Sequence, residues 1–169
     1  MKHTHTRRFD HAFSWPDPPF HVVLVEPEIP PNTGNIARLC AATGCQLHLI
    51  EPLGFTIDDA KLRRAGLDYW DSIAPAIHPS WKAYLEAARP ARMFLFSTGA
   101  PASIFEARFK PGDHLVFGSE TRGLSDELLA RYPDQRLGIP LQTAHVRSLN
   151  LSTAAGIAVY EALRQQQKF

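Results

Sequence analysis

Residues 139–160 read I-P-L-Q-T-A-H-V-R-S-L-N-L-S-T-A-A-G-I-A-V-Y and run from an apolar strand end through a polar loop into an apolar helix. Small and apolar side chains recur there at three- and four-residue steps, as expected for a helix with one buried face. Ser148 and Asn150 precede the helix and can accept hydrogen bonds from its first N–H groups. Arg147 stands beside these backbone donors, which suits a polar ligand. Alone, the stretch is more typical of a capped terminal helix packed on a sheet.

Short, continuous apolar runs precede this stretch and indicate strands that are buried on both faces. The runs that we interpret as strands are 21–25, 46–50, 73–77, 92–97, 114–118 and 136–139. Helical patterns alternate with them, beginning near residue 34 and at residues 58, 80 and 125. Such alternation predicts an α/β fold with a mostly parallel sheet and helices on both faces.

Length and composition restrict the class of protein. The 169 residues predict an irregular N-terminal arm over 1–20 and one domain over 21–169. A net charge of +1 excludes a strong overall attraction to nucleic acid, so an RNA partner needs a local basic patch. No apolar run approaches the roughly 18 residues of a membrane span. The two cysteines lack zinc-site spacing, and we expect a reduced, cytoplasmic protein without a metal or a membrane partner.

Ligands of parallel sheets bind beyond the carboxyl ends of the strands, where polar loops containing glycine occur in this chain. The glycine pattern of dinucleotide sites is missing after the first strand, and no Walker sequence occurs. Gly118 ends a strand and permits close approach of a ligand to the backbone. Glu120 can accept from a ligand or cap the turn before Ser125. Arg122 can bind phosphate or form a solvated ion pair.

Basic residues also occur on two of the expected helices. Asn35 and Arg38 are three residues apart and share a helix face that can hold a phosphate or a ribose. The alternative for an isolated arginine is a surface ion pair. Lys61, Arg63 and Arg64 form a cluster that, with Arg38, can make a local phosphate-binding patch or a solvated helix face.

Three stretches together are similar to the motifs of a known enzyme class. They are E-P-E-I-P-P-N-T-G-N-I-A-R-L-C-A-A-T-G (26–44), L-V-F-G-S-E-T-R-G-L (115–124), and I-P-L followed by R-S-L-N-L-S-T-A-A-G-I-A-V-Y-E (139–161). Their order and spacing resemble the SPOUT class of RNA methyltransferases. The nearest likeness is the small tRNA (cytidine/uridine-34)-2'-O-methyltransferase family, to which L-R-R-A-G-L-D-Y-W (62–70) adds a further stretch. The resemblance extends over residues 21–165.

The resemblance implies a C-terminal deep trefoil knot that binds S-adenosylmethionine, and it implies a homodimer in which the closing helix packs closely. The positions that match the cofactor-binding residues of the family are Phe96, Thr98, Gly118, Ile139, Leu141, Ser148 and Leu149.

The resemblance also implies the activity. Arg38 matches the catalytic arginine of the family, Asn35 is its neighbour, and Tyr160 matches a tyrosine of the last helix. The expected reaction is 2'-O-methylation of the tRNA wobble nucleotide, cytidine or uridine 34. The alternatives are 2'-O-methylation of ribosomal RNA and a non-catalytic, knotted RNA-binding protein.

Overall fold

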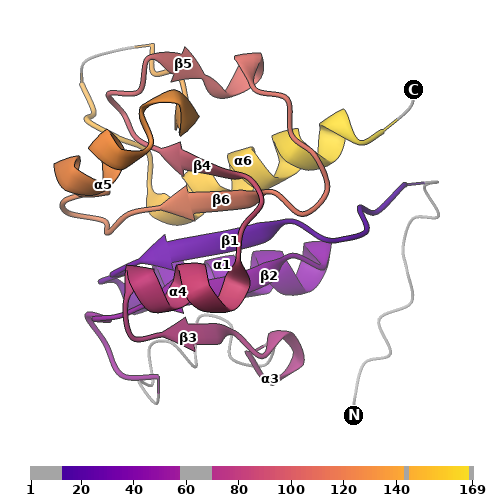
Figure 1. The fold of residues 1–169 in the computed structure, drawn as a ribbon, viewed down its shortest axis with the longest axis vertical. Helices are drawn as coiled ribbons and strands as arrows, with labels where there is room; N and C mark the ends of the chain where they lie inside the picture. Colours follow the sequence, from indigo (N-terminus) through magenta and orange to yellow (C-terminus); the bar gives the residue numbers. More distant parts are fainter. Residues whose placement is uncertain (1–12, 58–69, 143–144, 168–169) are drawn as a thin grey trace.

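A computed structural model describes residues 13–57, 70–142 and 145–167 of the chain. They form a seven-stranded sheet in the order β3-β2-β1-β6-β4-β7-β5, and every neighbouring pair is parallel (Figure 1). The strands are β1 (His21–Val25), β2 (Gln46–Ile50), β3 (Ala76–His78), β4 (Met93–Phe96), β5 (Ala102–Ser103), β6 (His114–Phe117) and β7 (Arg136–Gly138). The helix predicted at residue 58 and the basic cluster of Lys61, Arg63 and Arg64 lie outside the described residues.

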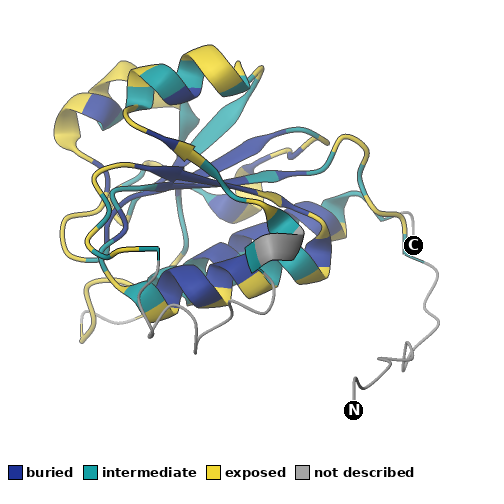
Figure 2. Ribbon diagram, turned by 90° about the horizontal axis from the view of Figure 1, so that it is seen from below, coloured by how far each residue is buried: buried dark blue, intermediate teal, exposed yellow. Residues whose placement is uncertain are grey.

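Helices cover both faces of the sheet, as the alternating pattern predicts (Figures 1 and 2). The α-helices are α1 (Pro30–Thr43), α3 (Trp70–Ile73), α4 (Trp81–Ala88), α5 (Asp126–Arg131) and α6 (Leu151–Gln165), and the 3-10 helices are η2 (Ile104–Glu106) and η3 (Pro133–Gln135). Helices α1 and α6 pack side by side on one face, and α4 and α5 lie on the other. No helix among the described residues is long and apolar enough to cross a membrane.

The core divides into two parts because successive side chains of a strand point to opposite faces. Val22 and Leu24 of β1 belong to the cluster that includes the inner sides of α1 and α6. Val23, between them, belongs to the cluster beneath α4 and α5, where it is joined by Tyr84. Both faces of the central strand are therefore apolar, which explains its continuous hydrophobic run.

Two boundaries differ from the sequence-based prediction. Helix α1 begins at Pro30 with Ile29 as its N-cap, and not near Gly34, so Asn32 lies in its first turn. Proline suits this position because its φ is already helical and its missing N–H would have no partner there. The strand expected at 73–77 is also displaced, since α3 ends at Ile73 and β3 occupies Ala76–His78.

The closing helix α6 is capped by Asn150, whose side-chain oxygen accepts from the N–H groups of Ser152 at 2.9 Å and Thr153 at 3.3 Å. Its small residues pack inward: Ala155 and Ala158 are fully buried against the protein's own sheet and α1. They are therefore not available to the close dimer packing that the resemblance suggests for this helix. The trefoil knot stays a prediction, because residues 143–144, between β7 and α6, lie outside the described residues.

Candidate functional site

A cavity of about 600 Å³ opens beyond the carboxyl ends of β4, β6 and β7. The loops after these strands line it, together with the N-terminal ends of α1 and α6. Every cofactor-binding residue implied by the resemblance lines this cavity: Phe96, Thr98, Gly118, Ile139, Leu141, Ser148 and Leu149. Phe96 stacks on Phe117 with ring centroids 4.7 Å apart, which gives the cavity an aromatic wall. The structure thus brings into one cavity residues from the three loops that were chosen from the sequence.

Gly118 has a reason to be glycine that differs from the expected one. A Cβ atom there would lie 2.0 Å from the Gly123 carbonyl carbon and 2.1 Å from the Leu124 nitrogen. The loop folds back on itself through an antiparallel bridge between Ser119 and Gly123. The backbone of its own loop leaves no room for a side chain at Gly118, so glycine is needed there whether or not a ligand approaches its backbone.

Glu120 joins the loop after β6 to the start of α1. Its carboxylate accepts from the backbone N–H groups of Glu28 at 2.7 Å and Ile29 at 3.1 Å, and from the Asn32 amide at 3.0 Å. The Asn32 amide oxygen in turn accepts from the side chain of Asn150, the N-cap of α6, at 2.9 Å. A carboxylate beside the N-terminus of α1 is favoured by the helix dipole. One hydrogen-bonded chain thus connects the three sequence motifs at the cavity wall.

Sequence reasoning did not find the partners that Glu120 and Asn32 have within the protein. It offered Glu120 a ligand or the turn before Ser125. Both side chains bond to groups that are distant in sequence. Their presence in two motifs at strand ends was the available signal. Arg122 is 73% exposed and lies 3.5 Å from the Glu26 carboxylate, as in the ion-pair alternative.

None of the predicted catalytic residues lines the cavity. Asn35 and Arg38 are exposed on α1, and Tyr160 is 56% exposed on α6. Because α1 and α6 pack together, these side chains belong to the same layer of the molecule. The chain by itself therefore separates the predicted catalytic residues from the predicted cofactor residues.

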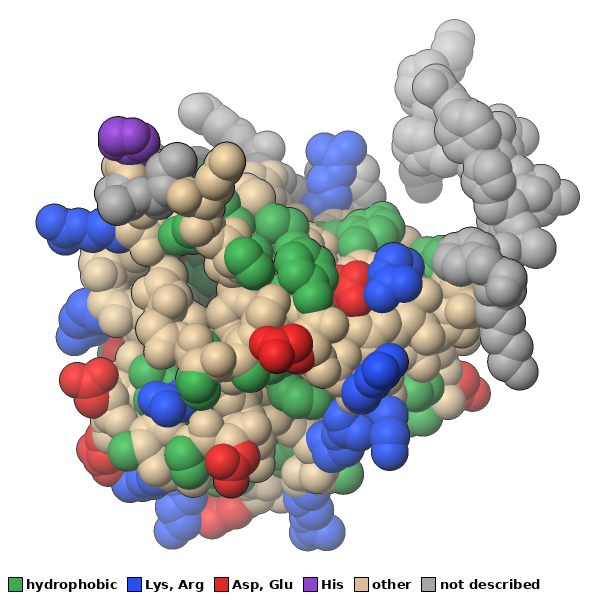
Figure 3. Space-filling model, turned by 90° about the horizontal axis from the view of Figure 1, so that it is seen from above, with side chains coloured by type: hydrophobic (Ala, Val, Ile, Leu, Met, Phe, Trp, Pro, Cys, Tyr) green, Lys and Arg blue, Asp and Glu red, His purple; other side chains and the backbone are tan. Residues whose placement is uncertain are grey.

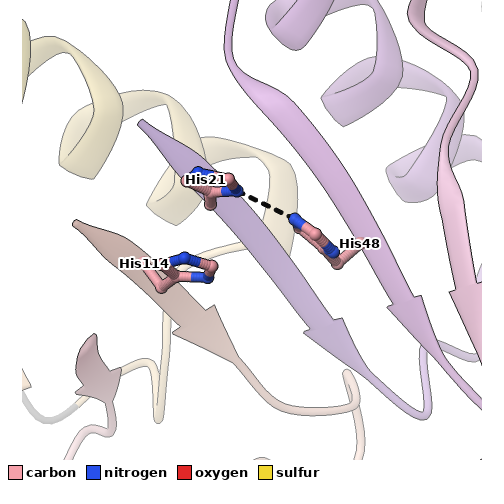
Figure 4. Close-up of side chains that lie close together, drawn as sticks. All are labelled: His21, His48 and His114. Atoms are coloured by element: carbon pink, nitrogen blue, oxygen red, sulfur yellow. Dashed lines mark hydrogen bonds between the residues drawn. The ribbon is translucent and has the colours of Figure 1, made fainter. Parts of the chain in front are cut away.

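A row of histidines crosses four neighbouring strands on the sheet face beneath α4, and Figure 4 shows His21, His48 and His114 of this row. His21 Nδ1 lies 2.9 Å from His48 Nε2, and His48 Nδ1 lies 3.0 Å from His78 Nε2. His114 Nδ1 lies 2.6 Å from the Tyr84 hydroxyl. Sequence reasoning missed this row because the histidines are scattered along the chain and only the strand register aligns them.

Three of these imidazoles, from His21, His48 and His114, offer nitrogen atoms within 4.8 Å of one another, a donor set of the kind that binds transition metals. The rings of His21 and His114 are stacked, however, with centroids 3.9 Å apart and planes at 6°. Since imidazole lone pairs lie in the ring plane, parallel stacked rings do not aim at a common point. The contacts fit a hydrogen-bonded row better than a ligand set.

Burial keeps this row neutral. Desolvation, together with a smaller contribution from the neighbouring imidazoles, lowers the pKa of His48 to about 4 and that of His114 to about 3. Desolvation likewise lowers the pKa of His21 and His78. A neutral imidazole has one N–H donor and one acceptor nitrogen, so successive rings can bond in sequence without a net charge.

Known proteins resemble this chain over most of its length. The tRNA (cytidine(34)-2'-O)-methyltransferase of Burkholderia pseudomallei is 55% identical over 86% of this chain and 95% of its own. The enzyme of the same name from Escherichia coli K12 is 50% identical over 86% of this chain and 92% of its own.

Solved structures agree. One described as giving insights into the 2-OH methylation of C/U34 on tRNA superposes with a TM-score of 0.82, at 55% identity, over 86% of this chain and 95% of that chain. The SpoU methyltransferase AviRb from Streptomyces viridochromogenes, in complex with AdoMet, has a TM-score of 0.74 at 28% identity, over 86% of this chain and 60% of that one. The model of the SpoU rRNA Methylase family matches residues 19–160, and the chain therefore belongs to this family.

Proposed function

We propose that this protein transfers a methyl group from S-adenosylmethionine to the ribose 2'-hydroxyl of the tRNA wobble nucleotide, cytidine or uridine 34. One observation carries the proposal. The residues implied as cofactor-binding line one cavity, in a chain at least half identical to tRNA (cytidine(34)-2'-O)-methyltransferases. This identity favours the wobble nucleotide over ribosomal RNA, although the family description names rRNA.

The cavity suits S-adenosylmethionine by size and by lining. A volume of about 600 Å³ lies within the usual range for small-molecule sites. The apolar side chains of Phe96, Ile139 and Leu141 can cover an adenine ring. Polar groups stand at other parts of the wall, where an amino-acid tail needs them, and they include Ser148 and Arg147. S-adenosylmethionine supplies an electrophilic methyl group on a sulfonium.

The side chains outside the cavity would act on the RNA. A ribose hydroxyl is a weak nucleophile until it is aligned or deprotonated. Arg38 would neutralise the adjacent phosphate and hold the hydroxyl in line, because a guanidinium keeps its proton and donates in a planar fork. Asn35 would add an amide donor and acceptor, and Tyr160 would contact the substrate from α6. Alignment alone can supply a large share of the rate acceleration.

Charge at the surface fits local recognition of RNA better than overall attraction. Figure 3 shows Lys and Arg side chains both at the margin of this face and within it, interspersed with acidic ones. The net charge of +1 agrees with this mixture. Binding to tRNA would therefore depend on a few phosphate contacts and should weaken as salt rises.

The protein would act as a homodimer in the cytoplasm, without a metal. Asn35, Arg38 and Tyr160 are exposed and lie outside the chain's own cavity. In a dimer, the cavity of the second protomer would lie beside the α1–α6 layer and so bring these side chains close to a bound cofactor. Exposed apolar side chains, Ile29 beside the cavity and Tyr160 on α6, support a partner there.

The test is methyl transfer from labelled S-adenosylmethionine to undermodified tRNA, with the product nucleotide mapped by mass spectrometry. We expect one 2'-O-methylated nucleotide at position 34. Transfer to ribosomal RNA but not to tRNA would contradict the substrate. Cofactor binding without transfer to either would favour a non-catalytic RNA-binding protein.

A further inference from the structure

Glu28 holds two loops together at the edge of the cavity. Its carboxylate accepts from the Thr121 hydroxyl, at 2.9 Å to Oε1 and 2.7 Å to Oε2, and from the Thr121 backbone N–H at 3.2 Å. In the opposite direction, the Glu28 backbone N–H donates to the Glu120 carboxylate at 2.7 Å. Arg122 also lies 3.9 Å from Glu28. We call this reciprocal set of contacts the Glu28 clasp.

The clasp connects the part of the chain that lines the cavity to the helix that carries Arg38. Thr121 belongs to the cavity-lining loop after β6, and Glu28 stands two residues before Pro30, where α1 begins. A helix is a rigid element, so fixing its first turn also fixes the direction of residues further along it. Arg38 follows Pro30 by about two turns at 3.6 residues per turn.

The Glu28 contacts are stronger than an ordinary surface ion pair. Its side chain is only 28% exposed, whereas that of Arg122 is 73% exposed. The carboxylate receives both an N–H and an O–H from Thr121, and charge-assisted hydrogen bonds of this kind are shorter and stronger than neutral ones. The contact with Arg122 is long and exposed, and it adds little.

We propose that Glu28 is a positioning residue. Through its contacts with Thr121, the placement of α1 and of Arg38 depends on the conformation of the cavity-lining loop after β6. The proposal rests on the proposed function for its kinetic consequence. Its structural consequence is independent: occupation of the cavity should stiffen the start of α1 through Glu28.

The kinetic test compares Glu28→Ala with Glu28→Gln. Glutamine keeps one oxygen that can accept from both the N–H and the hydroxyl of Thr121, and it loses the negative charge, the second oxygen and the exposed contact with Arg122. We expect the alanine variant to lose about tenfold or more in kcat, since small misplacements of an aligning group are costly. The glutamine variant should stay within about threefold of wild type. Glu127→Ala, which removes an exposed i,i+4 pair with Arg131 on α5, is the matched control and should leave kcat unchanged.

The structural test is amide hydrogen exchange with and without S-adenosylmethionine. In the wild type and in Glu28→Gln, cofactor should slow exchange over residues 32–36, since Pro30 and Pro31 have no amide hydrogen. In Glu28→Ala this protection should fall by about half or more, because only the Glu120 contacts then join the loop to α1, while cofactor affinity by calorimetry stays within about threefold. A role in stability alone would lower the melting temperature of the alanine variant without changing kcat or this protection.

The outcomes separate the two proposals. Wild-type protein that transfers no methyl group to tRNA would contradict the proposed function, and the exchange measurement would still judge the clasp. Glu28→Ala with wild-type kcat and wild-type protection of α1 would overturn the positioning role.

Discussion

Single residues show how far a motif can be trusted. Arg38 was chosen from the sequence as the catalytic group, and the structure places it on an exposed helix face outside the cavity. Gly118 was chosen for approach to a ligand, and the structure shows that its own loop leaves no room for a Cβ atom. The motif led to a glycine in the wall of the cavity, for which the structure gives a different physical reason, and the catalytic role of Arg38 stays a prediction.

Arg38→Ala should reduce single-turnover methyl transfer by about a hundredfold or more if Arg38 aligns the ribose and its phosphate. Its stability should fall by less than about 1 kcal/mol, because the side chain is exposed. Arg38→Lys should also be slow, since lysine lacks the planar fork. Lys82→Ala, which removes an exposed cation from α4, is the control. A near-wild-type rate for Arg38→Ala would move the catalytic role to Asn35 or Tyr160.

Gly118→Ala should disrupt the loop from Ser119 to Leu124, because even a methyl group would lie about 2 Å from its backbone. We expect loss of cofactor affinity and a lower melting temperature, measured by calorimetry and by thermal unfolding. Gly99→Ala is a matched control beside the cavity, since its Cβ would meet nothing within 4 Å. Unchanged affinity in a folded Gly118→Ala variant would contradict this account.

At the scale of helices and strands, the packing of α6 and the register of β1 and β6 decide contacts that a sequence motif does not show. Helix α6 buries its alanines, so the surface it offers to a partner lies on the opposite side, where Thr153 and Tyr160 are exposed. Strand register likewise places His21 opposite His114 and thereby builds the histidine row.

Gly156→Glu should separate a dimer into monomers without unfolding them, if α6 lies in the interface. A Cβ at this position meets nothing within 4 Å, and replacing a helical glycine favours the helix by up to about 1 kcal/mol. Sedimentation measures the change in mass, and Ala130→Glu on the exposed side of α5 is the control. A native dimer in the Gly156→Glu variant would exclude this face. Ala155→Glu, in contrast, should unfold the protein, because Ala155 is fully buried.

The histidine row should make stability fall as the pH drops below about 6.5. Below this pH the histidines of the unfolded chain bind protons, whereas His48 and His114 of the folded protein stay neutral because their pKa values are about 4 and about 3. The loss is at most about 1.4 kcal/mol per pH unit for each buried histidine and ends near the folded pKa. Urea unfolding between pH 7.5 and 5.5 measures it.

His48→Gln should flatten this dependence, because an amide can donate and accept within the row but does not titrate. The account is wrong if wild type and His48→Gln have the same slope.

At the scale of the whole molecule, strands and helix order followed from the sequence because buried strands are continuous apolar runs. The predicted and observed bounds of β1 are the same, residues 21–25. Strand β5 has only two residues, which is too short for an apolar pattern to be recognised. The start of α1 was placed too late because the groups that fix it, the backbone N–H groups of Glu28 and Ile29 and the side chain of Asn32, bond to Glu120, about ninety residues away in the chain. Hydrogen bonds between residues far apart in the chain produce no recognisable pattern in the local sequence. The histidine row could not be predicted for the same reason.

The strand order also decides how the protein can emerge from the ribosome. Strand β4 pairs only with β6 and β7, both of which are synthesised after it, and β1 lacks one of its two neighbours until β6 appears. The nascent chain must therefore carry unpaired, apolar strand edges through more than half of its translation, a state prone to association with other chains. The wall of the cavity formed by Asn150 and the start of α6 is synthesised last, so any product of premature termination before that point has an incomplete binding site.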